Sequence, residues 1–153
     1  LLYGGINFAS VTERAVTPNG AIGGMMRLHA HHVSCRVAMR EFWGNQAEGI
    51  TLFPHVDHTT TDEAAVRNNI IWFHQLILGQ FLEADHPEIE RTYRLFADTV
   101  REGAARVAAG EEDSRLIYEC RAEQAAPDDA AYAMRGWQAV LYYLLLRPEF
   151  LLQ

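Results

Sequence analysis

The sequence predicts an all-α protein, an irregular helical bundle, and three observations lead to this fold class. Apolar residues recur every three or four positions along several long segments, as amphipathic helices require. The clearest stripe consists of Val66, Ile70, Phe73, Ile77 and Phe81. Residues that cap helices stand before these segments, and no segment of strand length alternates between apolar and polar residues.

The longest predicted helix covers residues 18–43 and is expected to lie at the centre of the bundle. Thr17 is its expected N-cap, Pro18 its first residue and Gly44 its C-terminal stop. At about 100° per residue, its apolar side chains fall on two opposite faces. One face carries Met25, Leu28, His32, Cys35, Met39 and Phe42, and the other carries Met26, Ala30, Val33 and Val37. A helix with two apolar faces is expected to pack against other helices on both sides.

Three further helices are predicted to pack around it, over residues 63–81, 87–109 and 129–146. A capping box at Thr60 and Glu63 precedes the first of them. Pro148 ends the last one and is expected to begin a short final helical turn. The connection formed by residues 44–61 is long for a compact domain, so it is a candidate functional or interface loop.

Length and composition indicate one domain, residues 1–153, and exclude several function classes. All 13 basic residues are arginine, so a lysine Schiff base and a lysine-containing phosphate loop are excluded on this chain. A formal charge of −7 with dispersed arginines argues against nucleic acid as a partner. The longest apolar run, Ala139 to Leu146, is far shorter than the roughly 20 residues of a membrane span, so no span is expected in this segment.

A cluster of histidine and cysteine residues is the candidate metal site, with zinc as the transition metal considered. On the long helix, His31 and His32 precede Cys35 by four and three positions, which places imidazole and thiolate groups near one point. The candidate further ligands are His55, Asp57 and His58 of the 44–61 connection. The alternative interpretation is that His32 is a hydrogen-bonded core histidine and Cys35 a buried residue, because the paired spacing of strong zinc motifs is absent from the sequence.

Cys35 and Cys120 are the only two cysteines, and a disulfide between them is the second hypothesis for Cys35. Such a bond forms in an oxidising compartment and would consume the thiolate that a metal needs. The two hypotheses therefore exclude each other at Cys35. A catalytic Cys35 nucleophile is disfavoured, since the residue lies in the middle of a helix on an apolar face.

Four segments carry a resemblance to a known group of proteins. They are LYGGINFASVTERA, MRLHAHHVSCRVAMREF, EAAVRNNIIWFHQLILG and WQAVLYYLLLRPEFLL. They resemble the C-terminal helical region of large exported bacterial multidomain proteins of unknown function, of the kind found beside c-type cytochrome domains. The resemblance implies an extracytoplasmic location (periplasm or cell surface), a parent chain with other domains, and no known activity. This sequence has no C-x-x-C-H haem motif, so a haem would belong to another segment or partner.

These observations favour a non-catalytic structural or interaction domain of a larger exported protein. The chain opens without an initiator methionine or signal peptide, which also suggests a segment of a longer protein. A first alternative is a metal-binding or metalloenzyme domain that uses the histidine and cysteine cluster. A second is an accessory domain that docks on a c-type cytochrome partner. Whether the domain is an enzyme is left open, with a non-enzyme favoured and no catalytic residue or resident cofactor assigned.

Overall fold

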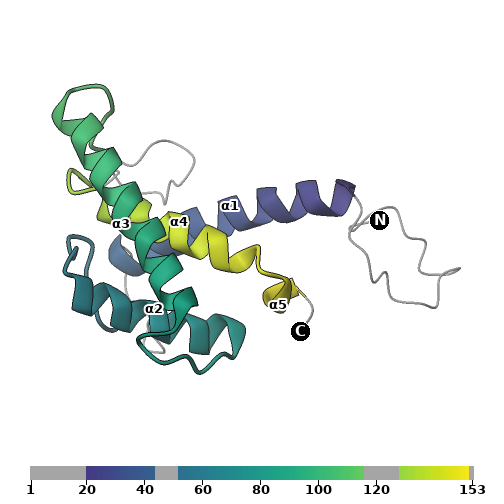
Figure 1. The fold of residues 1–153 in the computed structure, drawn as a ribbon. Helices are drawn as coiled ribbons and strands as arrows, with labels where there is room; N and C mark the ends of the chain where they lie inside the picture. Colours follow the sequence, from purple (N-terminus) through teal and green to yellow (C-terminus); the bar gives the residue numbers. More distant parts are fainter. Residues whose placement is uncertain (1–19, 44–51, 116–127, 152–153) are drawn as a thin grey trace, which may run out of the picture.

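The computed structural model describes residues 20–43, 52–115 and 128–151, and these ranges form an all-α bundle, as predicted. Its helices are α1 (Gly20–Trp43), α2 (Glu63–Leu78), α3 (Pro87–Ala108), α4 (Ala133–Leu145) and α5 (Pro148–Leu151). Figure 1 shows how they are arranged in space. The four long predicted helices and the final helical turn are present, and the ends of α2, α3 and α4 differ from the predicted ones by up to four residues. Thr17, Pro18 and Gly44, the predicted cap, first residue and stop of the 18–43 helix, lie outside the described residues.

Side-chain and backbone caps explain where α2 and α3 begin and end. The N-cap of α2 is Asp62, whose carboxylate accepts a hydrogen bond from the Ala65 N–H at 3.0 Å, and not Thr60 of the predicted capping box. Gly79 ends α2 in the left-handed conformation, with φ 65°. His86 caps α3, because its Nδ1 accepts a hydrogen bond from the Glu88 N–H at 3.1 Å.

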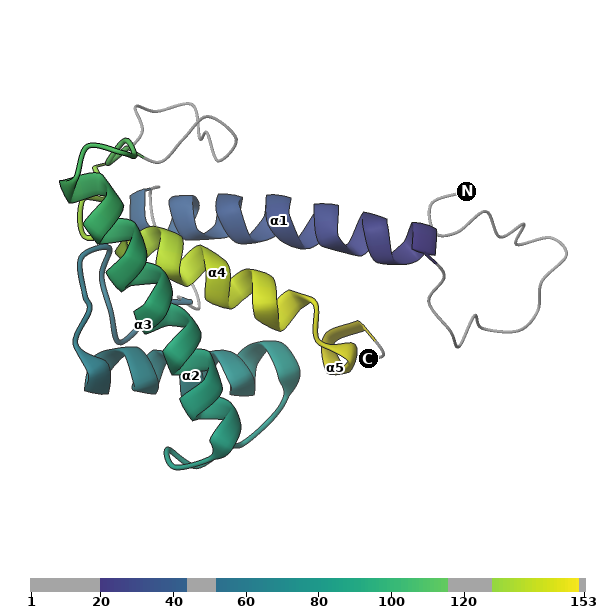
Figure 2. The same cartoon turned by 45° about the horizontal axis from the view of Figure 1, so that its top comes forward.

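α4, and not α1, lies at the centre of the described bundle. α4 contacts each of the other four helices, whereas α1 contacts only α4 among them. Figure 2 shows α1 and α4 side by side, with α3 crossing α4. The expected central position of the 18–43 helix is thus corrected. Met25 and Leu28, predicted to lie on a packed apolar face of this helix, are 40% and 60% exposed, while α4 buries Trp137 and Leu144 completely.

An aromatic cluster forms the middle of the hydrophobic core. The Trp137 ring centroid lies 4.7 Å from that of Phe96, 5.4 Å from Phe53 and 5.5 Å from Phe73. Phe53 belongs to the connection between α1 and α2. Asn69, which is fully buried on α2, holds this connection by donating a hydrogen bond to the Leu52 carbonyl oxygen at 3.2 Å. The described part of the connection therefore contributes to the core.

Two glycines allow α3 and the beginning of α4 to approach closely. A Cβ at Gly136 would lie 2.8 Å from Val100 Cγ2 and 2.9 Å from the Phe96 ring. A Cβ at Gly103 would lie 2.2 Å from the Tyr132 ring. Any larger residue at either position would push the two helices apart.

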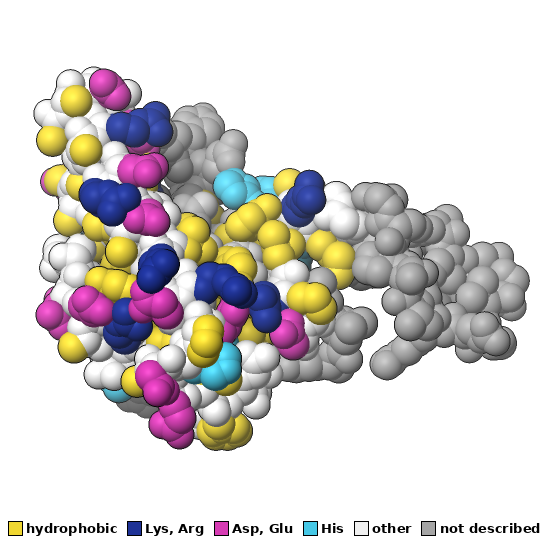
Figure 3. Space-filling view, in the orientation of Figure 1, with side chains coloured by type: hydrophobic (Ala, Val, Ile, Leu, Met, Phe, Trp, Pro, Cys, Tyr) yellow, Lys and Arg dark blue, Asp and Glu magenta, His cyan; other side chains and the backbone are white. Residues whose placement is uncertain are grey.

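On the face drawn in Figure 3, acidic and basic side chains are intermingled over α3. Arg94 pairs with Glu90 at 2.6 Å and Arg101 with Asp98 at 2.7 Å along this helix. Most of these side chains are exposed, so each ion pair contributes little stability. Among the helices of residues 20–43, 52–115 and 128–151, none combines the length and the apolar character that crossing a membrane requires.

Candidate functional site

The three candidate metal ligands of α1 differ in exposure. His31 is half-buried, with its ring edge-on to those of His32 and Tyr142 at centroid distances of 6.0 and 6.5 Å. His32 is exposed, so the alternative interpretation of His32 as a core histidine is wrong. Cys35 is 2% exposed and packs with Met39.

The three candidate ligands of the connection lie on a segment that is organised by hydrogen bonds. His55 is exposed, and its backbone N–H donates to Asn69 Oδ1 at 3.4 Å, while His58 is half-buried. Between them, the Asp57 carboxylate accepts hydrogen bonds from the N–H and hydroxyl of Thr59, each at 2.8 Å. The hydrogen bond from the Thr59 backbone N–H is the main cause that lowers the pKa of Asp57 to about 2. Asp57 thus stabilises a turn.

The described residues do not assemble a metal site. No group of three or more histidine, cysteine, aspartate or glutamate side chains in residues 20–43, 52–115 and 128–151 is placed to hold one metal ion. A structural zinc site needs four such ligands and a catalytic one needs three. The metal hypothesis thus has no assembled ligand set in this part of the chain.

Cys35 is not a free thiol, and its predicted partner Cys120 lies outside the described residues. The Cys35–Cys120 disulfide therefore stays a prediction. We expect mass spectrometry of peptides from the non-reduced protein to show Cys35 and Cys120 cross-linked, and the reduced sample to show them separate. Recovery of both cysteines as alkylated single peptides without reduction would contradict the disulfide.

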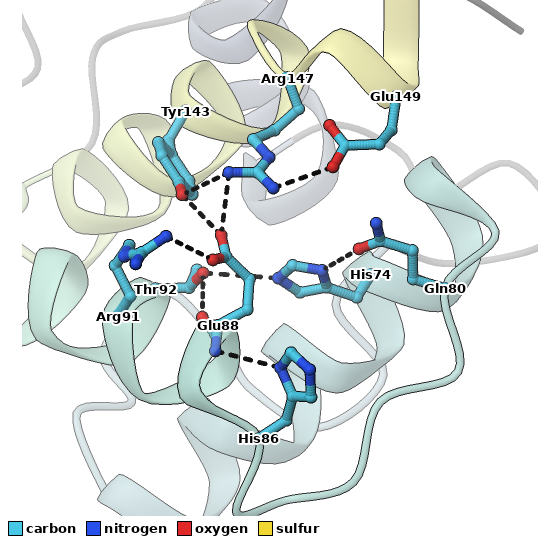
Figure 4. A network of polar contacts seen from close by, with 9 residues as sticks. All are labelled: His74, Gln80, His86, Glu88, Arg91, Thr92, Tyr143, Arg147 and Glu149. Carbon is cyan, nitrogen blue, oxygen red and sulfur yellow. Dashed lines mark hydrogen bonds and ion pairs between the residues drawn. The ribbon is translucent and has the colours of Figure 1, made fainter.

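A partly buried polar network joins the ends of four helices, and it is the candidate site (Figure 4). Its centre is the Glu88 side chain, which is 10% exposed in the first turn of α3. Oε1 accepts a hydrogen bond from the Tyr143 hydroxyl at 2.5 Å and lies 3.4 Å from Arg147 Nη1. Oε2 accepts a hydrogen bond from Arg91 Nη1 at 2.7 Å. Two guanidinium groups and one hydroxyl therefore engage both carboxylate oxygens.

His74 of α2 is the buried histidine of the structure, with 0% exposure. Its Nδ1 lies 3.0 Å from Gln80 Oε1, and its Nε2 lies 3.4 Å from Thr92 Oγ1. The Thr92 hydroxyl donates a hydrogen bond to the Glu88 carbonyl oxygen at 2.8 Å. Burial lowers the pKa of His74, and the Gln80 hydrogen bond opposes this effect.

Arg147 and Glu149 extend the network to α5. Arg147 Nη1 donates to the Tyr143 hydroxyl at 3.1 Å, and Nη2 donates to Glu149 Oε1 at 2.9 Å. Burial is the main cause that raises the pKa of Tyr143, and its hydrogen bond to Glu88 adds to the effect. The hydroxyl therefore stays protonated and can donate to Glu88 throughout the neutral range.

A second buried polar cluster surrounds Arg135 at the start of α4. Arg135 is 9% exposed, and its Nη1 donates to Glu112 Oε1 at 3.1 Å. Its Nη2 donates to the carbonyl oxygens of Asp113 at 2.8 Å and Arg115 at 2.6 Å. The Asp129 carboxylate accepts hydrogen bonds from the Met134 and Arg135 N–H groups and so caps α4.

One cavity of about 310 Å³ lies between α1, α3 and α4. Its lining consists of His31, Thr99, Tyr132, Arg135, Gln138, Ala139 and Tyr142. None of the nine residues drawn in Figure 4 borders it. The network around Glu88 is therefore separate from this cavity.

Neither polar network was predicted from the sequence. The spacing of His74 does indicate a buried position, because His74 follows Ile70 by four positions on the apolar stripe of α2. Glu88 stands in the first turn of a helix, where an acidic residue is common for electrostatic reasons alone.

The chain matches no protein-family model, and no curated protein or solved structure is significantly similar to it.

Proposed function

We propose that this chain is a non-catalytic structural or interaction domain of a larger exported protein. The observation that supports this proposal is the set of contacts made by the two oxygens of Glu88, the central buried carboxylate. A general acid or base needs an oxygen within hydrogen-bond reach of a substrate. Both oxygens of Glu88 instead bind side chains of Arg91, Tyr143 and Arg147, which join α3 to the end of α4.

The exported location and the contacts with other domains of a parent chain are supported by the resemblance of four sequence segments. Fractionation of cells that produce the tagged parent protein tests the location. The metal-binding alternative is tested by elemental analysis of the purified domain, and the cytochrome-docking alternative by the sequence of the parent gene.

A structural role of the network predicts a measurable coupling between Glu88 and Tyr143. Glu88→Gln and Tyr143→Phe are each expected to lower the free energy of unfolding by about 1–3 kcal/mol. Tyr143→Phe removes a donor from the Glu88 carboxylate, and Glu88→Gln removes the negative charge that Arg91 and Arg147 bind. The double variant is expected to lose less than the sum of the two, since the Tyr143 hydroxyl binds a neutral amide oxygen more weakly than a carboxylate and contributes less once the charge is gone. Urea unfolding of the four proteins measures this cycle.

The matched control is Glu102→Gln, since Glu102 is an exposed carboxylate on the same helix. This change is expected to alter the free energy of unfolding by no more than about 0.5 kcal/mol. Strictly additive effects of Glu88→Gln and Tyr143→Phe would contradict a structural role for their contact.

A further inference from the structure

The hydrogen bonds around His74 determine which of its ring nitrogens carry protons. Thr92 has a single hydroxyl hydrogen, and it is donated to the Glu88 carbonyl oxygen at 2.8 Å. The Thr92 hydroxyl oxygen lies 3.4 Å from His74 Nε2. Because its hydrogen is already used, this oxygen can only accept a hydrogen bond from Nε2. Nε2 is therefore protonated in this arrangement.

Gln80 presents its amide oxygen to the other ring nitrogen, Nδ1, at 3.0 Å. An amide oxygen also only accepts, so this contact requires a proton on Nδ1 of His74. The observed arrangement thus matches the imidazolium form, which alone has two N–H groups. A neutral His74 must lose one of the two hydrogen bonds or change one of its neighbours.

Gln80 is the neighbour that can change. Thr92 is fully buried within α3, whereas Gln80 is half-buried in the connection after α2. When the Gln80 amide turns over, its nitrogen can donate to an unprotonated Nδ1 of His74. Glu149 of α5 lies on the same side of the network as Gln80 (Figure 4), and its Oε2 is buried without a hydrogen-bond partner among the described residues. The pKa of Glu149 is lowered first by its own backbone N–H, then by Arg147, and to a smaller extent by Gln80.

Charged and titratable groups face His74 from each element packed against it. They are His86 before α3, Glu88 and Arg91 on α3, Tyr143 on α4, Arg147 after it and Glu149 on α5. The two carboxylates and two guanidinium groups balance in formal charge, so protonation of His74 adds one net positive charge to a partly buried cluster. Glu88 favours that charge, and Arg147 and His86 oppose it.

We propose that His74 and Gln80 form a proton-sensitive switch between α2 and α5. The imidazolium form holds the Gln80 oxygen toward His74 and leaves the Gln80 nitrogen toward Glu149. The neutral form draws the Gln80 nitrogen toward His74 and away from Glu149. Because burial lowers the pKa of His74 below its ordinary value of 6.5, the neutral form predominates at neutral pH and the switch operates in acid.

The pH dependence of stability has a definite sign. The unfolded chain binds a proton at His74 more strongly than the folded chain does, since the pKa of the buried imidazole is lowered. The contribution of His74 to stability is therefore complete above pH 6.5, the ordinary pKa, and is lost as the pH falls below it.

The test is nuclear magnetic resonance of ¹⁵N-labelled histidine side chains from neutral to acidic pH. We expect the Nε2–H tautomer of His74 at neutral pH and the imidazolium form in acid. The backbone amide signals of Glu149 and Phe150 are expected to shift with the same midpoint. A neutral Nδ1–H tautomer, or α5 amides that do not follow His74, would overturn the proposal.

Variants of Gln80 test the switch itself. Gln80→Glu is expected to raise the His74 midpoint by about one pH unit, because a carboxylate accepts a hydrogen bond from Nδ1–H and is negatively charged. Gln80→Leu is expected to lower it. Both proteins should fold, since Gln80 is half-buried and lies outside the helices.

The control is Gln75→Glu, at an exposed position of α2, which should leave the His74 midpoint nearly unchanged. Equal midpoints in the Gln80→Glu and wild-type proteins would refute the switch.

Discussion

Replacing Phe73 with alanine is expected to lower the free energy of unfolding by about 3–5 kcal/mol. Phe73 is 0% exposed, and its ring centroid lies 5.2 Å from that of Phe53 and 5.5 Å from that of Trp137. The truncation removes the transfer free energy of the ring and leaves a cavity beneath two other aromatic residues. Rigid helices on both sides limit how far the cavity can collapse.

The matched control is Phe81→Ala, the same substitution in the same apolar stripe of the sequence. Phe81 is 81% exposed, so its loss is expected to change the free energy of unfolding by less than about 0.5 kcal/mol. Urea unfolding monitored by circular dichroism measures both variants. Similar losses at Phe73 and Phe81 would mean that the exposed ring is covered in solution, which would contradict the exposure of Phe81 in this structure.

Periodicity predicted the helices well, because it reports which side of a segment is apolar. On α2, the stripe correctly places Val66, Ile70 and Phe73, which are all 0% exposed. It fails at Phe81 because Gly79 ends the helix in the left-handed conformation. Glycine after a helical pattern is a known stop signal, so this end could have been predicted from the sequence.

The position of each helix in the bundle was harder to predict, because a helix is central only when its neighbours surround it. The long helix has apolar residues on two faces, yet Leu28 remains 60% exposed while Ala30 is 1% exposed. α4 is shorter, but it places Trp137, Val140 and Leu144 among the other helices, and all three are 0% exposed. Local sequence patterns contain no information on which helix receives neighbours on every side.

The candidate site was not predictable, since its contacts join residues far apart in the sequence. Glu88 and Tyr143 are 55 positions apart, and each has an ordinary reason to occupy its helix. Similarly, His32 and His74 both follow apolar residues on a predicted helix, but only His74 is buried. Which histidine enters the core depends on tertiary packing, and spacing alone could not decide it.

Replacing Arg135 with methionine is expected to lower the free energy of unfolding by about 3–5 kcal/mol, because it removes one partner of a buried ionic cluster. Arg135 is 9% exposed, and it pairs with Glu112 at 3.1 Å and lies 3.9 Å from the fully buried Asp129 carboxylate. Methionine keeps much of the side-chain volume but leaves both carboxylates without this cation. It also removes the two hydrogen bonds to the carbonyl oxygens of Asp113 and Arg115.

Arg101→Met is the matched control for this change, because the Arg101 side chain is 70% exposed and pairs with Asp98 on the surface. The free energy of unfolding is expected to fall by at most about 1 kcal/mol in this control.

The pH dependence of the Arg135→Met variant adds a second test. Burial already raises the pKa of Asp129, and loss of Arg135 should raise it further, so the folded variant binds this proton more strongly than the unfolded chain does. The deficit of Arg135→Met relative to wild type should therefore be largest at neutral pH and shrink as the pH falls toward 3.8, the ordinary pKa of aspartate. Urea unfolding at a series of pH values measures this trend, and a deficit that is constant with pH would show that Arg135 acts on stability without its charge.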